Sequence, residues 1–151
     1  MDRPHSNQVR LGRFSERHRL YLLTSTTLHR APVLGEFHSA RLLVSQMREA
    51  EAEGAARSLA WVVMPDHFHW LIELGPVSLK TLMRRVKSRS TCAINRHLGR
   101  YGRLWQKSFH DRALRREEDL QAVARYIVMN PKRAGLVERV GDYPHWDAIW
   151  V

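Results

Sequence analysis

The sequence predicts an α+β fold, in which an antiparallel sheet carries helices on one face and a further helix follows near the C-terminal end. Runs of strand-forming residues alternate with segments whose apolar residues recur at helical spacing. Two of the strand runs are separated only by a tight turn, as in an antiparallel hairpin. The 151 residues suit one core. We therefore expect a polar tail over residues 1–16 and a single domain over residues 17–151.

The first strand and the first long helix are expected before Gly54. His18–Thr27 is rich in residues that favour strands. Glu36–Glu53 is predicted to be helical, because apolar residues recur along it at helical spacing and Gly54 supplies a stop. The apolar residues at this spacing are Phe37, Ala40, Val44 and Met47.

A hairpin is expected next, with Leu59–Met64 and Phe68–Leu74 joined through Pro65-Asp66-His67. Successive side chains of a strand point to opposite faces of the sheet. The side chains expected on one face are Phe68, Trp70, Ile72 and Leu74, and those expected on the other are His67, His69, Leu71 and Glu73. This alternation directs both histidines away from the apolar side.

A second long helix is predicted over Leu79–Leu98, with Ser78 as its N-cap and Gly99 as its terminator. Its apolar stripe is expected to contain Leu79, Leu82, Met83, Val86, Ala93 and Ile94. The cationic residues that lie mostly off this stripe are Arg84, Arg85, Lys87, Arg89 and Arg96. The helix should therefore bury one side and present positive charge on another.

Trp105–Leu114 is expected to be a strand and Glu117–Asn130 a helix, with acidic residues in its first turn, where the helix dipole favours them. The first six elements then follow the order strand, helix, strand, strand, helix, strand. This is the split β-α-β pattern of ferredoxin-like folds. Such a domain stacks helices on one sheet face and leaves the other face for a site.

The chain is strongly basic, and the excess charge lies in one segment. There are 25 Lys and Arg against 15 Asp and Glu, for a formal net charge of +10 and a pI near 10.8. Residues 84–139 hold 15 of the cations and 5 of the anions, so the rest of the chain is neutral. A polyanionic partner is indicated. Nucleic acid is favoured over a membrane surface, because no helix pairs a large apolar face with a continuous basic one.

The candidate contacts to nucleic acid come mostly from this segment. Cationic side chains can follow phosphates while aromatic rings stack on unpaired bases. The interleaved aromatic residues are Tyr101, Trp105 and Phe109. The cationic candidates are Arg84, Arg85, Lys87, Arg89, Arg96, Arg103, Lys107, Arg112, Lys132 and Arg133. The alternative interpretation of such a charge run is a solvated helix face.

Composition excludes several classes of protein. No apolar run approaches the length of a membrane span, and Met1–His5 does not open a signal peptide. Cys92 is the only cysteine, which excludes an internal disulfide and a cysteine-built zinc site and favours a cytoplasmic setting. Any metal ion would be held by histidine, carboxylate or amide ligands.

His67 and His69 are candidate metal ligands. Their spacing on a strand projects both imidazoles from the same face, so that both can reach one ion. Imidazole suits Mn, Zn, Fe and Ni, and also serves Mg or Mn when oxygen ligands complete the shell. In a chain with nine histidines, a His-x-His pair also arises by chance.

Tyr126 and Asn130 form a second candidate group, since residues four apart on a helix are surface neighbours. They lie at the margin of an apolar stripe, so the tyrosine can present its hydroxyl while its ring is packed. A divalent ion would polarise a phosphodiester, and the tyrosine oxygen could attack phosphorus to form a covalent intermediate. The alternative is that neither residue has a catalytic role. Tyr126 would then lie at the edge of the apolar stripe, and Asn130 with Pro131 would end the helix.

Three stretches resemble a known family. They are Val62–Ile72, which contains His67-Phe68-His69, then Gly102–Gln106, and Ala124–Val137. These stretches resemble the HUH nucleases, and in particular the single-tyrosine transposases and their REP-associated relatives. The similarity extends from the first predicted strand to Val137.

The resemblance implies a metal-dependent endonuclease and strand transferase for single-stranded DNA with hairpins or palindromic repeats, working as a monomer or a homodimer. It implies Mg²⁺ or Mn²⁺ held by His67 and His69, and Tyr126 as the nucleophile. Cleavage would leave a 5′-phosphotyrosine and a free 3′-hydroxyl. Asn130 matches the third ligand, where many members have glutamine, and Asp66 stands where the family often has asparagine.

Two other functions remain open from the residues themselves. A metallohydrolase could use His67 and His69 together with Asp66 or Glu73, and it would need no tyrosine. A domesticated nucleic-acid-binding module without catalysis would depend on the basic segment alone. Chelation of metal and substitution of Tyr126 would separate these functions from strand transfer.

Overall fold

The computed structural model describes residues 17–115 and 118–151, so the expected tail over residues 1–16 lies outside the described part of the chain. An antiparallel sheet of five strands forms the centre, in the order β4-β1-β3-β2-β5. The strands are β1 (Leu20–Thr26), β2 (Ala56–Met64), β3 (His67–Leu74), β4 (His110–Leu114) and β5 (Trp146–Ala148). The helices are α2 (Phe37–Ala52), α3 (Leu79–Leu98), α4 (Glu118–Val128) and α5 (Asn130–Arg133), and 3-10 turns lie at Leu28–Arg30, Val33–Gly35 and Val140–Asp142.

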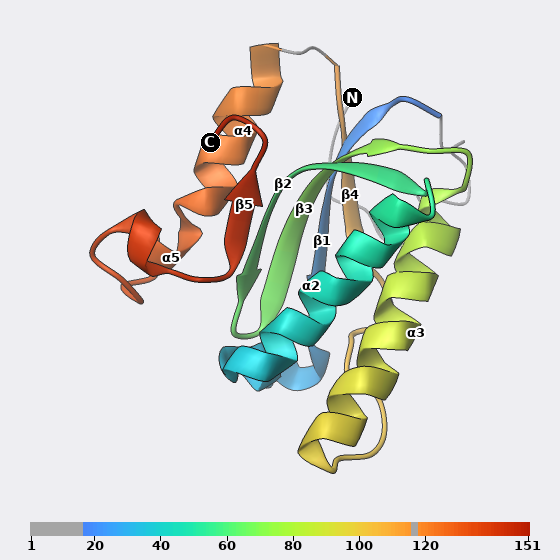
Figure 1. Cartoon of the computed structure of the whole chain (residues 1–151), viewed down its shortest axis with the longest axis vertical. Coiled ribbons are helices and arrows are strands. Elements are labelled where there is room, and N and C mark those ends of the chain that lie inside the picture. The colour runs from blue at the N-terminus through green and yellow to red at the C-terminus, as the bar shows by residue number, and fades with distance from the viewer. Residues whose placement is uncertain (1–16, 116–117) are drawn as a thin grey trace.

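The first six of these strands and α-helices form the predicted split β-α-β unit, with β1 between β3 and β4. Both long helices, α2 and α3, pack together on one face of the sheet (Figure 1). The β3 side chains in the core on this face are Phe68, Trp70, Ile72 and Leu74, which confirms the predicted apolar set. The main core therefore lies between the sheet and these two helices.

The opposite face is partly covered by α4, which packs against β2 and β5. The cluster that joins them includes Leu120, Val123, Ala124, Ile127, Val62 and Leu71. We expected this whole face to stay available for a site. Instead α4 covers the part over β2, because its own apolar stripe has to be buried.

Both predicted long helices form, α3 with its predicted ends and α2 one residue shorter at each end than expected. At the start of α2, the carboxylate of Glu36 accepts a hydrogen bond from the Ser39 N–H (2.8 Å). At the start of α3, the Ser78 hydroxyl accepts one from the Thr81 N–H (3.0 Å). Gly99 follows α3 with φ 64°, a left-handed conformation that a residue without Cβ adopts at little cost.

The strand expected over Trp105–Leu114 is shorter than predicted and begins only at His110. The reason is that Trp105 turns into the core, where its Nε1 donates to the Ser90 hydroxyl (3.1 Å). Phe37 also differs from the prediction. It lies in the first turn of α2 with its ring against His145 and is 51% exposed.

The helix expected over Glu117–Asn130 is divided in two. The first part, α4, ends at Val128, and α5 begins at Asn130, while Glu117 lies outside the described residues. Pro131 causes the break, because it has no N–H to continue the hydrogen bonds of α4 but fits the first turn of a new helix. In the described residues, no helix has the length and apolar character that crossing a membrane requires.

Candidate functional site

His67 and His69 lie on the face of β3 that points away from α2 and α3. The intervening Phe68 is buried in the main core on the other side. The two imidazole rings have centroids 5.0 Å apart and planes inclined at 77°. The predicted common face is therefore confirmed, and two nitrogen-bearing rings stand next to each other on a rigid strand.

A hydrogen bond holds the Nδ1 atom of each ring. His67 Nδ1 lies 2.8 Å from Asp66 Oδ1, and His69 Nδ1 lies 2.7 Å from the Thr24 hydroxyl. Asp66 is held in turn by the Nε of Arg30, at 3.0 Å. Such partners fix the orientation of an imidazole that binds a metal and leave Nε2 as the nitrogen for the ion.

Electrostatics favour a neutral His69 and an ionised Asp66. Burial, with smaller contributions from His67 and Arg133, lowers the pKa of His69 to about 4. At neutral pH its imidazole is therefore uncharged and keeps a lone pair for a metal ion. Burial alone would raise the pKa of Asp66, but the hydrogen bond and charge of His67, together with Arg30, outweigh it and hold that pKa below its ordinary value.

Tyr126 lies on α4 with its side chain 63% exposed, so its ring is not part of the core. The guanidinium carbon of Arg133, on α5, lies 3.9 Å from the centroid of this ring, in a cation–π contact. Arg133 Nη2 also donates to Asn130 Oδ1 (2.7 Å). Arg133 therefore contacts both the tyrosine and the asparagine, and its charge contributes slightly to the lowered pKa of His69.

The pairing of the strands brings two further basic residues, His110 and Arg112, to the histidine face. Thr24 of β1 pairs with His69 on one side and with His110 of β4 on the other. Arg112 is two residues further along β4 and therefore points to the same face as His110. Both side chains are exposed. Arg112 is thus a predicted nucleic-acid contact on this face, and Arg133 is close enough for its charge to affect His69.

Four of the other predicted contacts line a cavity on the α3 side of the sheet. The cavity measures 1410 Å³, and its cationic candidates are Arg84, Lys87, Arg103 and Lys107. Lys87 also donates through Nζ to the backbone oxygens of Gln106 and Ser108, which ties α3 to the segment before β4. This cavity is on the opposite side of the sheet from the histidine pair.

Two of the three remaining α3 candidates are engaged in contacts with α2. Arg89 forms ion pairs with Glu49 and Glu53 at 2.8 and 3.0 Å, and Arg85 lies 3.9 Å from Glu53. These contacts link α3 to α2. Arg96 is exposed at the far end of α3.

The predicted stacking roles of Trp105 and Phe109 are wrong, because both rings are buried. Trp105 packs edge-on against Phe68 in the main core. Tyr101 is 94% exposed and is the one predicted stacking residue whose ring is available.

Sequence reasoning missed Thr24, Arg30 and His110. Each of these residues comes from a segment far along the chain from the hairpin that carries His67 and His69. For Thr24 alone, the sequence gives a weak indication: it lies in a predicted strand, where every second side chain points to the same face of the sheet. Its partner on β3 depends on the register between β1 and β3, which no local pattern specifies.

Comparison with known proteins identifies the family. The family model described as "Transposase IS200 like" matches residues 19–130, which include the whole sheet except β5, the histidine pair, Tyr126 and Asn130. The chain belongs to the IS200-like transposase family. The resemblance noted from the sequence is thereby confirmed.

Two curated relatives of this transposase-family chain are REP-associated. The protein named REP-associated tyrosine transposase in Escherichia coli is 32% identical over 87 residues, which cover 56% of this chain and 50% of the relative. A protein of the same group from Haemophilus influenzae is 29% identical over 99 residues, covering 58% of this chain and 56% of the relative. The chain thus spans about half the length of the curated relatives it matches.

A solved structure described as a REP-associated tyrosine transposase bound to a REP hairpin shares the fold. It superposes with a TM-score of 0.73 and 23% identity, over 89% of this chain and 79% of the other. A transposase-like protein of Deinococcus radiodurans matches with a TM-score of 0.56 and 24% identity, over 79% of this chain and 95% of the other. This chain therefore shares its fold with these two solved structures.

Proposed function

We propose that this chain is a metal-dependent endonuclease and strand transferase for single-stranded DNA that contains hairpins or palindromic repeats. The observation that carries the proposal is the pair of oriented imidazoles on β3. Tyr126 supports it as an exposed tyrosine on α4 that shares the partner Arg133 with Asn130. The names of the relatives support a REP-type substrate, since one related structure is described as bound to a REP hairpin.

The metal would be Mg²⁺ or Mn²⁺, held by His67 and His69 with Asn130 as a third ligand. The donors fit such an ion, because His69 is neutral and both Nδ1 atoms are held by other groups. When bound, a divalent ion would polarise the scissile phosphate and stabilise the charge that develops on it. Asn130 can contribute only after its Oδ1 leaves Arg133.

Tyr126 would be the nucleophile of the reaction. Its phenolic oxygen, losing its proton, attacks phosphorus and forms the tyrosine–phosphate bond, while the bond from phosphorus to the 3′ oxygen breaks. The departing 3′ oxygen takes up a proton and becomes a free hydroxyl. The 5′-phosphotyrosine retains the bond energy, so a 3′-hydroxyl of another strand can attack it and restore a phosphodiester.

The cationic side chains would hold the strand around this centre. Arg112 on the histidine face, together with Lys132 and Arg133 of α5, would neutralise phosphates there. The cavity beside α3 offers a second row of cations for DNA outside the cleavage site. We place this activity in the cytoplasm, a reducing compartment that suits a chain with a single cysteine.

The carboxylates that a tyrosine-independent metallohydrolase would need are engaged in other contacts. Asp66 is held by Arg30 and His67. Glu73 pairs with His18 at 3.0 Å and with Arg57 at 3.4 Å. These ion pairs favour the mechanism that uses Tyr126.

The proposal is tested with a labelled single strand that contains a hairpin, incubated with Mg²⁺ or Mn²⁺ and run on a denaturing gel. We expect a slow band of covalent protein–DNA adduct that disappears with a chelator and in Tyr126→Phe. Tyr101→Phe serves as the matched control and should keep the adduct, because that ring lies at the end of α3. Cleavage that persists in Tyr126→Phe would exclude the phosphotyrosine mechanism.

A further inference from the structure

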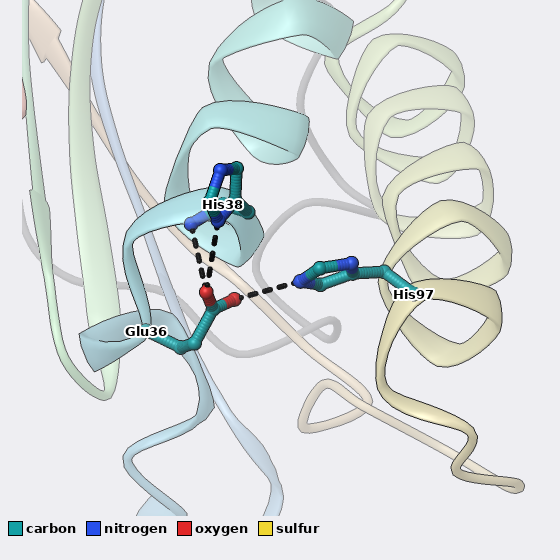
Figure 2. A group of neighbouring side chains, drawn as sticks. All are labelled: Glu36, His38 and His97. Atoms are coloured by element: carbon teal, nitrogen blue, oxygen red, sulfur yellow. Dashed lines mark hydrogen bonds and ion pairs between the residues drawn. The ribbon is translucent and has the colours of Figure 1, made fainter.

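We propose that Glu36, His38 and His97 form a second metal site, for a borderline-soft divalent ion such as Zn²⁺, where the start of α2 meets the end of α3. One ligand atom from each residue lies within 4.8 Å of the others. Figure 2 shows the carboxylate of Glu36 between the two imidazoles, with His38 on α2 and His97 reaching across from α3. This cluster belongs to the helices that cover the main core, whereas His67 and His69 lie on the other face of the sheet.

The distances suit a shared ion. His97 Nε2 lies 3.0 Å from Glu36 Oε1, and His38 Nδ1 lies 3.2 Å from Glu36 Oε2. Two ligands of one tetrahedral zinc ion, each about 2.0–2.2 Å from it, stand about 3.3–3.6 Å apart. Both imidazole nitrogens therefore lie slightly closer to the carboxylate than two ligands of one ion would, and their ring centroids are 5.6 Å apart. Small rotations of two exposed rings would complete the site.

The donor set and its charge suit the same ion. The Ser39 hydroxyl, assisted by the backbone N–H groups of Ser39 and His38, lowers the pKa of Glu36 to about 2, so the carboxylate is ionised at neutral pH. Two imidazoles with one carboxylate favour Zn²⁺ over Mg²⁺, which prefers oxygen ligands and retains its waters. The ion would replace the protons that the imidazoles now share with Glu36.

Occupation of this site would connect two helices. Glu36 caps α2, and His97 lies in the last turn of α3, so the ion would join the ends of two elements that pack side by side. Because an ion that binds only the folded chain stabilises it, Zn²⁺ should raise the melting temperature. The site would thus serve the stability of the helical layer rather than DNA cleavage.

The test is a calorimetric titration of the full chain with Zn²⁺, in the background His67→Ala/His69→Ala, which removes the ligands of the proposed catalytic ion. We expect one equivalent to bind and to raise the melting temperature. Adding His97→Ala should weaken binding at least about 100-fold, since loss of a partner outside the ligand shell already costs about 10–100-fold. The matched control is His110→Ala, another exposed histidine, and it should leave binding unchanged.

If the double variant does not fold, the same comparison is made in the unaltered chain, where His97→Ala should remove one equivalent of Zn²⁺. The proposal is overturned if Zn²⁺ fails to bind the folded double variant. It is overturned equally if His97→Ala and His110→Ala bind alike, because the cluster would then be a hydrogen-bonded helix cap only. Cleavage of the DNA hairpin with Mg²⁺ should persist in His97→Ala, so this test is independent of the proposed function.

Discussion

Thr24 shows how a side chain without chemistry of its own can determine the geometry of a site. Its hydroxyl lies 2.7 Å from Nδ1 of His69 and comes from the neighbouring strand β1. The hydrogen bond fixes the plane of the ring and the nitrogen that remains for an ion. Loss of a hydrogen-bond partner of this kind typically lowers metal affinity about 10–100-fold.

We expect Thr24→Val to raise the Mn²⁺ concentration needed for half-maximal cleavage about 10–100-fold, because the His69 ring loses the partner that orients it. Thr24→Ser, which keeps the hydroxyl, should stay close to the unaltered protein. Cleavage assays across a Mn²⁺ series measure the effect. Equal metal dependence of the two variants would mean that the hydroxyl does not orient the ring.

His145 should make stability depend on pH. It is buried, and burial together with the charge of Arg41 lowers its pKa below the ordinary 6.5. Below about pH 6.5 this residue therefore binds more protons in the unfolded chain than in the folded chain. The free energy of unfolding should fall as the pH decreases through this range, because protonation favours the unfolded state.

Urea unfolding at a series of pH values between 7.5 and 5 tests this dependence. His145→Leu should flatten the slope, and the exposed His110→Leu should leave it unchanged. Some slope should remain in His145→Leu because the pKa of His69 is lowered as well. An identical slope in both variants would show that His145 does not titrate differently in the two states.

At the scale of elements, patterns that repeat along the chain were sufficient to predict most of the fold. The alternation in β3 separated the histidines from Phe68 and Trp70 correctly, because a strand has two faces and only one was apolar. Gly99 ended α3 as expected. The missed strand β5 is only three residues long and pairs with the edge of β2, so its formation depends on a distant partner.

The caps offer the simplest test of an element. Ser78→Ala removes the acceptor for the Thr81 N–H at the start of α3 and should lower the free energy of unfolding by about 1 kcal/mol. Ser88→Ala, at an exposed position within α3, should be neutral or slightly stabilising, since alanine has the higher helix propensity. Chemical denaturation measures the free energy of unfolding of both variants. Equal values would show that the Ser78 cap does not stabilise α3.

At the scale of the whole molecule, the candidate site is assembled from four separate segments of the chain. β3 supplies the histidines, β1 supplies Thr24, α4 supplies Tyr126 and α5 supplies Arg133. The common face of the two histidines was predictable from their spacing on a strand, whereas their role and that of Tyr126 stay predictions. Thr24 and the contacts of Arg133 were not predictable, because they follow from how the strands register and how the chain turns at Pro131.

Arg133 contacts both Tyr126 and Asn130, the proposed third ligand, within one chain, which favours a tyrosine that acts within its own chain. We therefore expect no covalent adduct when Tyr126→Phe is mixed with His67→Ala/His69→Ala, each inactive alone. A denaturing gel of the mixture, with circular dichroism to confirm that both variants fold, provides the measurement. Recovery of the adduct would show that one subunit supplies the tyrosine to the histidines of another in a homodimer.

The position of Arg133 has a consequence for the order of events. Its guanidinium lies over the aromatic ring of Tyr126 and at the same time holds the amide oxygen of Asn130. Under the proposed mechanism, a DNA phosphate that attracts this cation would uncover the tyrosine ring and free the amide oxygen in a single movement. The incoming strand would thus make the third ligand available at the moment when the phosphate arrives.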